Sequence, residues 1–166
     1  AKEVGSDLIL GTDPDSDRVG VMVRGADGEY HTITGNQMGV LLLDYIITAR
    51  RRKGTLPENA AAISTIVTSK MVRRICDVND IHFDETFTGF KFMAEKLAEY
   101  QRDGSYQYVL AFEESYGYMM GDYVRDKDAV TACVMITEMA AYYFEQGMTL
   151  AQALDALYEK YGFYGE

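Results

Sequence analysis

The sequence has few of the features that mark membrane or secreted proteins. Its longest apolar runs, such as residues 40–43 (VLLL), are far too short to cross a bilayer. No signal peptide is visible. Its only cysteines, Cys76 and Cys133, lie in helix-like segments among apolar residues, which is typical of free, buried thiols in a reducing compartment. We therefore expect a cytoplasmic protein that does not bind a membrane.

Positive charge is also scarce. The 16 lysines and arginines stand against 26 aspartates and glutamates, so the formal net charge is −10. This balance argues against a general surface for nucleic acid or anionic lipid, and a phosphorylated ligand would need a local basic patch. With 166 residues, of which 48% are hydrophobic and 25% charged, the chain has the length and composition of a soluble domain with a real core.

Short apolar strands alternate along the chain with longer helices. Strands are predicted at residues 7–10, 19–24, 29–33, 61–67, 81–83 and 108–112, and helices at 36–52, 69–78, 90–102, 128–146 and 149–161. This alternation predicts an α/β fold in which a mostly parallel, mixed sheet lies between helices in three α/β/α layers. Ligands bind such sheets at the carboxyl ends of strands, so we expect the chemistry in loops 11–18, 84–91 and 113–127.

The first of these loops, GTDPDSDRVG, carries Asp13, Asp15 and Asp17 at alternate positions. With no histidine or cysteine nearby, it offers oxygen ligands, which suit Mg²⁺ or Ca²⁺ over zinc. An EF-hand would need glycine and glutamate where Arg18 and Arg24 stand. Three crowded carboxylates repel one another unless a cation neutralises them, so we favour a metal site over an acidic surface turn. Arg18 would then suit a phosphate oxygen.

The second loop reads TFTGFK. Gly89 allows close backbone approach and Phe90 begins a predicted helix. Taken alone, an aromatic residue at a helix start usually belongs to the core, and Lys91 is more often a solvated side chain.

The third loop reads FEESYG. Glu113 and Ser115 place a carboxylate and a hydroxyl two residues apart after a strand. Each can bond one of two neighbouring hydroxyl groups of a ligand. A charged turn that caps the next element is the alternative.

Together these motifs resemble those of the α-D-phosphohexomutases, the phosphoglucomutase/phosphomannomutase family. The acidic loop is similar to the family's metal-binding loop, D-x-D-x-D-R. TFTGFK is similar to its specificity loop, and FEESYG to its sugar-binding loop G-E-x-S-(G/F)-(G/H), although Phe112 stands where the family often has glycine. The segment GDYVRDKDAV completes four motifs in the family's order. The resemblance covers nearly the whole chain and is nearest to the bacterial α-phosphoglucomutase branch, whose relatives include phosphopentomutases.

The resemblance implies roles for individual residues. Asp13, Asp15 and Asp17 would bind Mg²⁺, and the catalytic residues would be Arg18 and Lys127, the latter either as an acid/base group or as a phosphate ligand. The substrate-binding residues would be Thr88, Gly89, Phe90, Lys91, Glu113, Ser115, Arg125 and Lys70, the last in the segment TSK.

The resemblance also implies a place in a larger enzyme. Residues 1–24 would be the end of the second of four domains and residues 25–166 the third. The catalytic phosphoserine would lie in another domain, which fits a start without methionine. The implied partners are these missing domains, glucose 1-phosphate, glucose 6-phosphate and glucose 1,6-bisphosphate. The chain alone would be inactive, and mannose or pentose phosphates remain alternative substrates.

Two other readings of the acidic loop remain open. Phosphatases with an aspartyl nucleophile carry D-x-D-x-T/V after an apolar strand, but Asp17 occupies the fifth position here. A non-catalytic α/β interaction module stabilised by a metal ion is the other.

Overall fold

The computed structural model describes residues 1–25 and 27–165. The chain begins with strands β1 (Leu8–Thr12), β2 (Val19–Arg24) and β3 (Tyr30–Ile33), which form an antiparallel sheet in the order β1-β2-β3. Alternate residues of β2 are buried, so one face of this sheet packs on the core. The strands predicted at residues 19–24 and 29–33 are present and pair with each other as an antiparallel hairpin. The alternation of strands and helices did not indicate that these strands form a sheet of their own.

A second sheet contains the remaining strands. They are β4 (Ala60–Thr65), β5 (His82–Thr86), β6 (Gln107–Phe112) and β7 (Tyr118–Met119), in the order β5-β4-β6-β7. The first three run parallel, and β7 is antiparallel to β6. The expected mixed, mostly parallel sheet is therefore confirmed. The two-residue strand β7 was not predicted, and the strand expected over residues 61–67 ends at Thr65 because the chain turns there.

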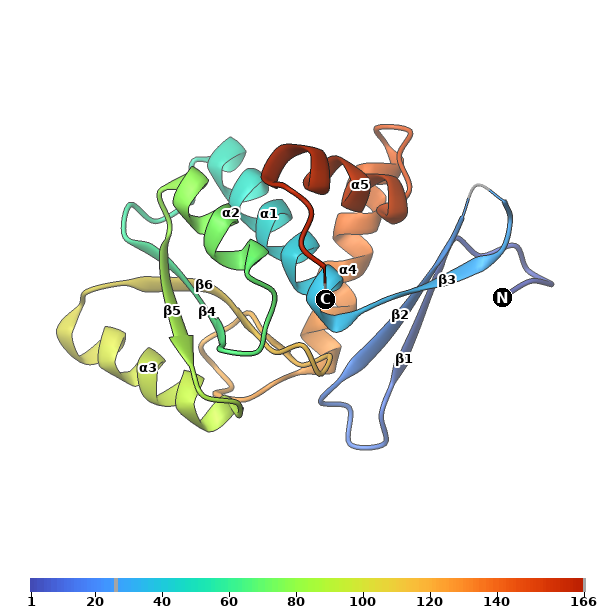
Figure 1. Cartoon of the computed structure of the whole chain (residues 1–166). Helices are drawn as coiled ribbons and strands as arrows, with labels where there is room; N and C mark the ends of the chain where they lie inside the picture. The colour runs from blue at the N-terminus through green and yellow to red at the C-terminus, as the bar shows by residue number, and fades with distance from the viewer. Residues whose placement is uncertain (26, 166) are drawn as a thin grey trace.

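Helices cover both faces of this second sheet (Figure 1). Helix α3 (Phe90–Asp103) lies on one face, and α1 (Gly35–Lys53) and α2 (Met71–Asn79) lie on the other. Side chains of β4 alternate accordingly, because Ala61 and Ile63 pack with α3 whereas Ala60 and Ala62 belong to the larger core. The predicted three-layer α/β/α architecture is thus confirmed.

Helix α1 lies directly on the sheet. Its N-cap is Thr34, whose hydroxyl accepts from the Gln37 backbone N–H while the Gln37 side chain bonds back, as in a capping box. A Cβ on Gly39 would lie 1.9 Å from the ring of Phe112. Gly39 therefore leaves the room that this large ring needs on β6.

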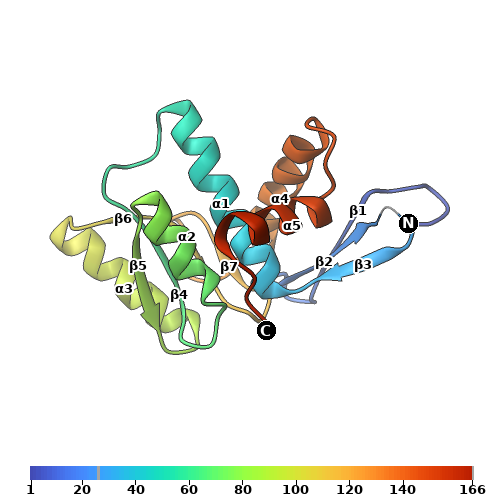
Figure 2. The ribbon, with the colours of Figure 1, turned by 45° about the horizontal axis from the view of Figure 1, so that its top comes forward.

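Helices α4 (Ala129–Phe144) and α5 (Leu150–Tyr161) complete the chain and pack against α1. Figure 2 shows the antiparallel sheet extending from the body of the molecule on the side of α4. Among the described helices, none combines the length and the apolar character that crossing a membrane requires.

Candidate active site

The tip of the β1–β2 hairpin meets two other loops. The backbone N–H of Val19 donates to the carbonyl of Tyr116 at 3.2 Å, and Ala129 N–H donates to the carbonyl of Ser16 at 3.1 Å. Arg18 and Gly117 form an isolated antiparallel bridge. These contacts hold the acidic loop against the turn after β6 and the start of α4.

The three aspartates of that tip form a compact cluster of oxygen donors. Carboxylate oxygens of Asp13, Asp15 and Asp17 lie within 4.8 Å of one another. Asp13 Oδ1 accepts from the backbone N–H groups of Asp17 and Arg18, each at 3.1 Å. The bond from Arg18 is the main reason that the pKa of Asp13 is lowered, so this carboxylate is ready to bind a cation.

Asp17 offers an oxygen that lacks a partner. Its Oδ1 atom is buried and accepts no hydrogen bond from any described residue, and Arg18 Nε, 3.7 Å away, is too distant to donate one. A buried carboxylate oxygen without a donor is costly. The unpartnered oxygen and the all-carboxylate donor set therefore fit a hard divalent cation such as Mg²⁺.

Lys127, on the loop before α4, reaches the same cluster. Its Nζ atom lies 2.8 Å from Asp17 Oδ2 and 5.6 Å from the centroid of the Phe90 ring. A Cβ on Gly117 would lie 2.9 Å from Lys127 Cδ, so this glycine leaves space for the lysine stem. The hydrogen bond to Asp17 is the main cause that raises the pKa of Lys127, which keeps the ammonium protonated.

The two predicted sugar loops are joined by Glu113. Its Oε1 atom accepts from the Gly89 backbone N–H at 2.5 Å, and its Oε2 atom accepts from the Ser115 hydroxyl at 3.2 Å. Gly89 adopts a φ of 113°, a conformation that side chains rarely allow. With only 8% of Glu113 exposed, these three predicted residues form one fixed group beside the acidic loop.

The remaining predicted residues lie outside the group formed by Gly89, Glu113 and Ser115. Thr88, on the loop before α3, and Lys91, in the first turn of α3, are exposed, whereas Phe90 is 4% exposed and lies in the core under that helix. Lys70 pairs with Glu85 at 2.7 Å. Arg125 donates to Gln101 at 2.7 Å.

Among the described residues, neither Lys70 nor Arg125 forms a hydrogen bond or ion pair with the acidic loop. The roles of all these residues stay predictions.

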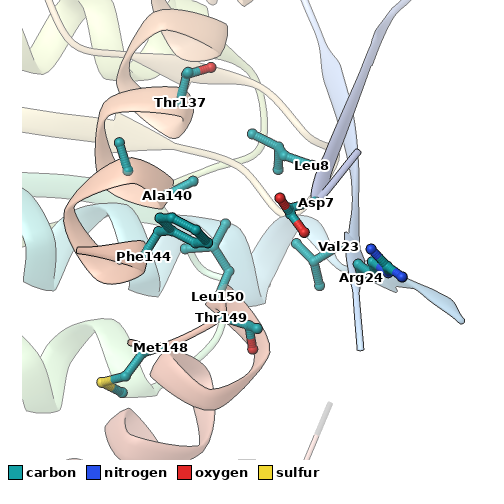
Figure 3. Close-up of a pocket in the computed structure, with 11 residues that line it drawn as sticks. Asp7, Leu8, Val23, Arg24, Thr137, Ala140, Phe144, Met148, Thr149 and Leu150 are labelled. Atoms are coloured by element: carbon teal, nitrogen blue, oxygen red, sulfur yellow. The ribbon is translucent and has the colours of Figure 1, made fainter. Parts of the chain in front are cut away.

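A cavity of about 360 Å³ lies elsewhere, between the antiparallel sheet and the turn that joins α4 to α5 (Figure 3). Its lining is mostly apolar and includes Leu8, Val23, Phe144 and Leu150. Leu8 and Val23 pair at the end of the hairpin opposite the acidic tip. Since the aspartates gather at the other end, we place the candidate active site at the tip.

The fold and these loops match known proteins. The domain family described as phosphoglucomutase/phosphomannomutase, alpha/beta/alpha domain III, matches residues 34–161. A phosphopentomutase from Mus musculus is 35% identical over 167 residues, which cover 99% of this chain and 27% of the relative. A phosphoglucomutase from Staphylococcus aureus (strain USA300) is 36% identical over 162 residues, which cover 98% of this chain and 28% of the relative.

Solved structures share the fold at lower identity. Parafusin, a phosphoglucomutase from Paramecium in its open form, superposes with a TM-score of 0.69 at 21% identity, covering 95% of this chain and 25% of that protein. An N-acetylphosphoglucosamine mutase from Aspergillus fumigatus, solved with GlcNAc-6P and magnesium, gives a TM-score of 0.66 at 13% identity, covering 96% of this chain and 36% of that protein.

The chain spans little more than a quarter of the length of the curated relatives that it matches. The family match nevertheless covers most of the chain, and the loops with the family's motifs lie together in space. The chain belongs to the phosphoglucomutase/phosphomannomutase family, and residues 34–161 are its third, α/β/α domain.

Proposed function

We propose that this chain supplies the metal-binding and sugar-binding part of a phosphoglucomutase that interconverts glucose 1-phosphate and glucose 6-phosphate. The observation that carries this proposal is the contact between the three loops. Lys127 pairs with Asp17 at 2.8 Å, and Val19 on the same hairpin bonds the turn that holds Glu113 and Ser115. The proposed metal site, the Lys127 ammonium and the proposed sugar-binding pair of Glu113 and Ser115 therefore adjoin one another.

We also propose that other domains complete the enzyme. The mouse and staphylococcal relatives are between three and four times as long as the region that they share with this chain. This length supports a phosphoserine supplied from outside the chain. The proposed domain boundary lies at residues 24 and 25. Because β3 pairs with β2 across that point and the family match begins at residue 34, a boundary at residues 33 and 34 is the alternative.

The proposed reaction has two phosphoryl transfers. The phosphoserine gives its phosphoryl group to glucose 1-phosphate, which forms glucose 1,6-bisphosphate, and the other phosphate then returns to serine and leaves glucose 6-phosphate. Such transfers depend on positioning and charge neutralisation more than on covalent help. Mg²⁺, held by Asp13, Asp15 and Asp17, would supply Lewis acidity toward a phosphate oxygen.

The chain's own side chains would perform the remaining tasks. Arg18 presents a guanidinium beside the cluster, where it would neutralise charge on the transferring oxygens. Glu113 and Ser115 would bond two adjacent ring hydroxyls, a handle that remains similar after the bisphosphate turns over. The Lys127 ammonium lies 2.8 Å from Asp17 Oδ2, where it would act as an acid/base group or as a phosphate ligand.

A second substrate class has a specific observation in its favour. The mouse relative is a phosphopentomutase and is about as similar to this chain as the staphylococcal phosphoglucomutase. Pentose 1-phosphates are therefore the main competing substrates, ahead of mannose 1-phosphate. Membership in this family also argues against an aspartyl-nucleophile phosphatase.

Turnover by the full-length enzyme that contains this chain tests the proposal. With Mg²⁺, we expect it to convert glucose 1-phosphate with a higher kcat/KM than ribose 1-phosphate or mannose 1-phosphate. We expect the 166-residue chain alone to show no turnover. A preference for ribose 1-phosphate would contradict the glucose assignment, and turnover by the chain alone would contradict the phosphoserine donor outside it.

A further inference from the structure

Glu114 lies between the two proposed sugar ligands in the sequence, yet its side chain contacts a different loop. The Thr65 hydroxyl donates to Glu114 Oε2 at 3.1 Å, and the Thr68 oxygen lies 3.4 Å from the same atom. Both threonines are buried, with exposed fractions of 0% and 3%. The Glu114 carboxylate is therefore fixed to the carboxyl end of β4, while Glu113 bonds Gly89 on the loop after β5.

The hydroxyl protons form a consistent chain that ends on this carboxylate. Thr65 N–H donates to Thr68 Oγ1 at 3.3 Å, and the two threonine oxygens lie 2.8 Å apart. Two hydroxyls have only two protons, so one threonine donates to Glu114 and the other donates to its neighbour. The shorter distance to Glu114 Oε2, 3.1 Å against 3.4 Å, favours Thr65 as the donor to the carboxylate. A charged acceptor strengthens such a chain of hydrogen bonds. Withdrawing the acceptor oxygen of Glu114 would leave a buried threonine hydroxyl without a partner.

The first residue of helix α1, Gly35, packs closely against the backbone of the same turn. A Cβ on Gly35 would lie 2.0 Å from the Glu114 carbonyl oxygen and 2.9 Å from the Tyr116 nitrogen. Tyr116 has a φ of 69°, which a residue other than glycine adopts only where its surroundings hold it. The turn thus has a strained conformation and close backbone contacts, and the Glu114 side chain is its link to β4.

We propose that Glu114 is a positioning residue for the sugar site. This proposal rests on the proposed function. By binding Thr65, it sets the place of the turn that carries Glu113 and Ser115. The same turn accepts a hydrogen bond from Val19 on the metal hairpin, so Glu114 also sets the sugar ligands relative to the acidic loop. Displacing reacting groups by about 1 Å can cost on the order of 100-fold in rate.

Kinetics of the full-length enzyme test this role with glucose 1-phosphate as the probe. Glu114→Asp keeps the charge but withdraws the carboxylate by one methylene, and we expect it to raise KM and to lower kcat/KM by about 10- to 100-fold. Glu114→Gln keeps an acceptor oxygen in place and should stay within about threefold of the wild type. Thr65→Val should reproduce Glu114→Asp, and the double variant should add little, because the two share one interaction. Exposed Glu159, replaced by alanine, is the matched control.

A second readout follows the turn itself in the 166-residue chain. The Gly89 amide donates to Glu113, so Glu114→Asp should speed hydrogen exchange at that amide, whereas Glu159→Ala should leave it unchanged. A wild-type KM and unchanged Gly89 exchange in both Glu114→Asp and Thr65→Val would overturn the positioning role. If the wild-type enzyme does not turn over glucose 1-phosphate, the proposed function fails, and Gly89 exchange alone decides the positioning role.

Discussion

Replacing Glu113 by alanine should destabilise the fold, because this buried carboxylate joins the loop that carries Gly89 to the turn that carries Ser115. It accepts from the Gly89 N–H at 2.5 Å and from the Ser115 hydroxyl at 3.2 Å. Glu113→Gln is the informative comparison. The glutamine carbonyl can still accept from Gly89 while its amide donates to the Ser115 oxygen.

The magnitude follows from these two bonds. Hydrogen bonds to a charged group contribute about 1.5–3 kcal/mol each, which sets an upper bound of about 3–6 kcal/mol for the pair. Ser115 is partly exposed, so water can replace its bond. We therefore expect Glu113→Ala to lower the free energy of unfolding by about 2–4 kcal/mol, and Glu113→Gln by about 1 kcal/mol.

Urea unfolding of the chain, followed by circular dichroism, measures this difference. With a slope of about 2 kcal/mol/M, Glu113→Ala should lower the midpoint by about 1–2 M. A loss below about 1 kcal/mol for alanine, or equal losses for alanine and glutamine, would refute the reasoning that the charged bonds hold the two loops together. In the full-length enzyme, Glu113→Ala should also reduce the preference for glucose over mannose phosphates while Mg²⁺ affinity stays unchanged.

Three further predictions concern other parts of the molecule. Asp15→Asn should weaken Mg²⁺ binding and cost about 3 kcal/mol of transition-state stabilisation, measured as kcat/KM of the full-length enzyme at fixed Mg²⁺. Gly39→Ala should destabilise the fold by about 1–3 kcal/mol or more in urea unfolding, because its Cβ would lie 1.9 Å from the Phe112 ring. The Lys70 ammonium beside Glu85 lowers the pKa of that carboxyl from its ordinary value of 4.5, so this pair stabilises the fold above pH 4.5 and the benefit is lost as pH falls through the lowered pKa. Glu85→Gln should therefore flatten the pH dependence of the melting temperature in that acidic range.

Each of these predictions has an outcome that would contradict it. Gly20→Ala is the control for the packing prediction, because a Cβ there meets only one backbone oxygen at 3.8 Å; equal losses at the two glycines would argue against close packing as the cause. Wild-type kcat/KM in Asp15→Asn would rule out the metal assignment. A melting profile that remains unchanged after Glu85→Gln would show that the surface pair contributes nothing.

Much of the fold could be predicted from local sequence signals. Helical spacing placed α1, α3 and α5, and the threonines that precede α1 and α5, Thr34 and Thr149, form capping boxes. Asp128 caps α4, because its side chain accepts from the Val130 N–H. Each of these signals acts within one turn of helix, so it can be read without knowing the tertiary structure.

Contacts between distant segments could not be predicted in this way. Strand β7 has two residues, too few for a periodicity, and it forms because the turn after β6 returns the chain to the sheet edge. The bond from Thr65 to Glu114 joins residues 49 positions apart, and nothing in either local sequence indicates the other. Phe90 packs in the core under α3, as an aromatic residue at a helix start usually does, and its substrate role, which came from the family motif, stays a prediction.

The central claim is that the hairpin-tip aspartates hold a divalent cation beside the sugar loops. Mn²⁺ prefers oxygen ligands as Mg²⁺ does, so anomalous diffraction from Mn²⁺-soaked crystals of the chain tests the claim most directly. We predict one strong peak among the carboxylates of Asp13, Asp15 and Asp17, with no such peak in crystals of Asp15→Asn. A strong peak elsewhere with no density at the hairpin tip would contradict the account.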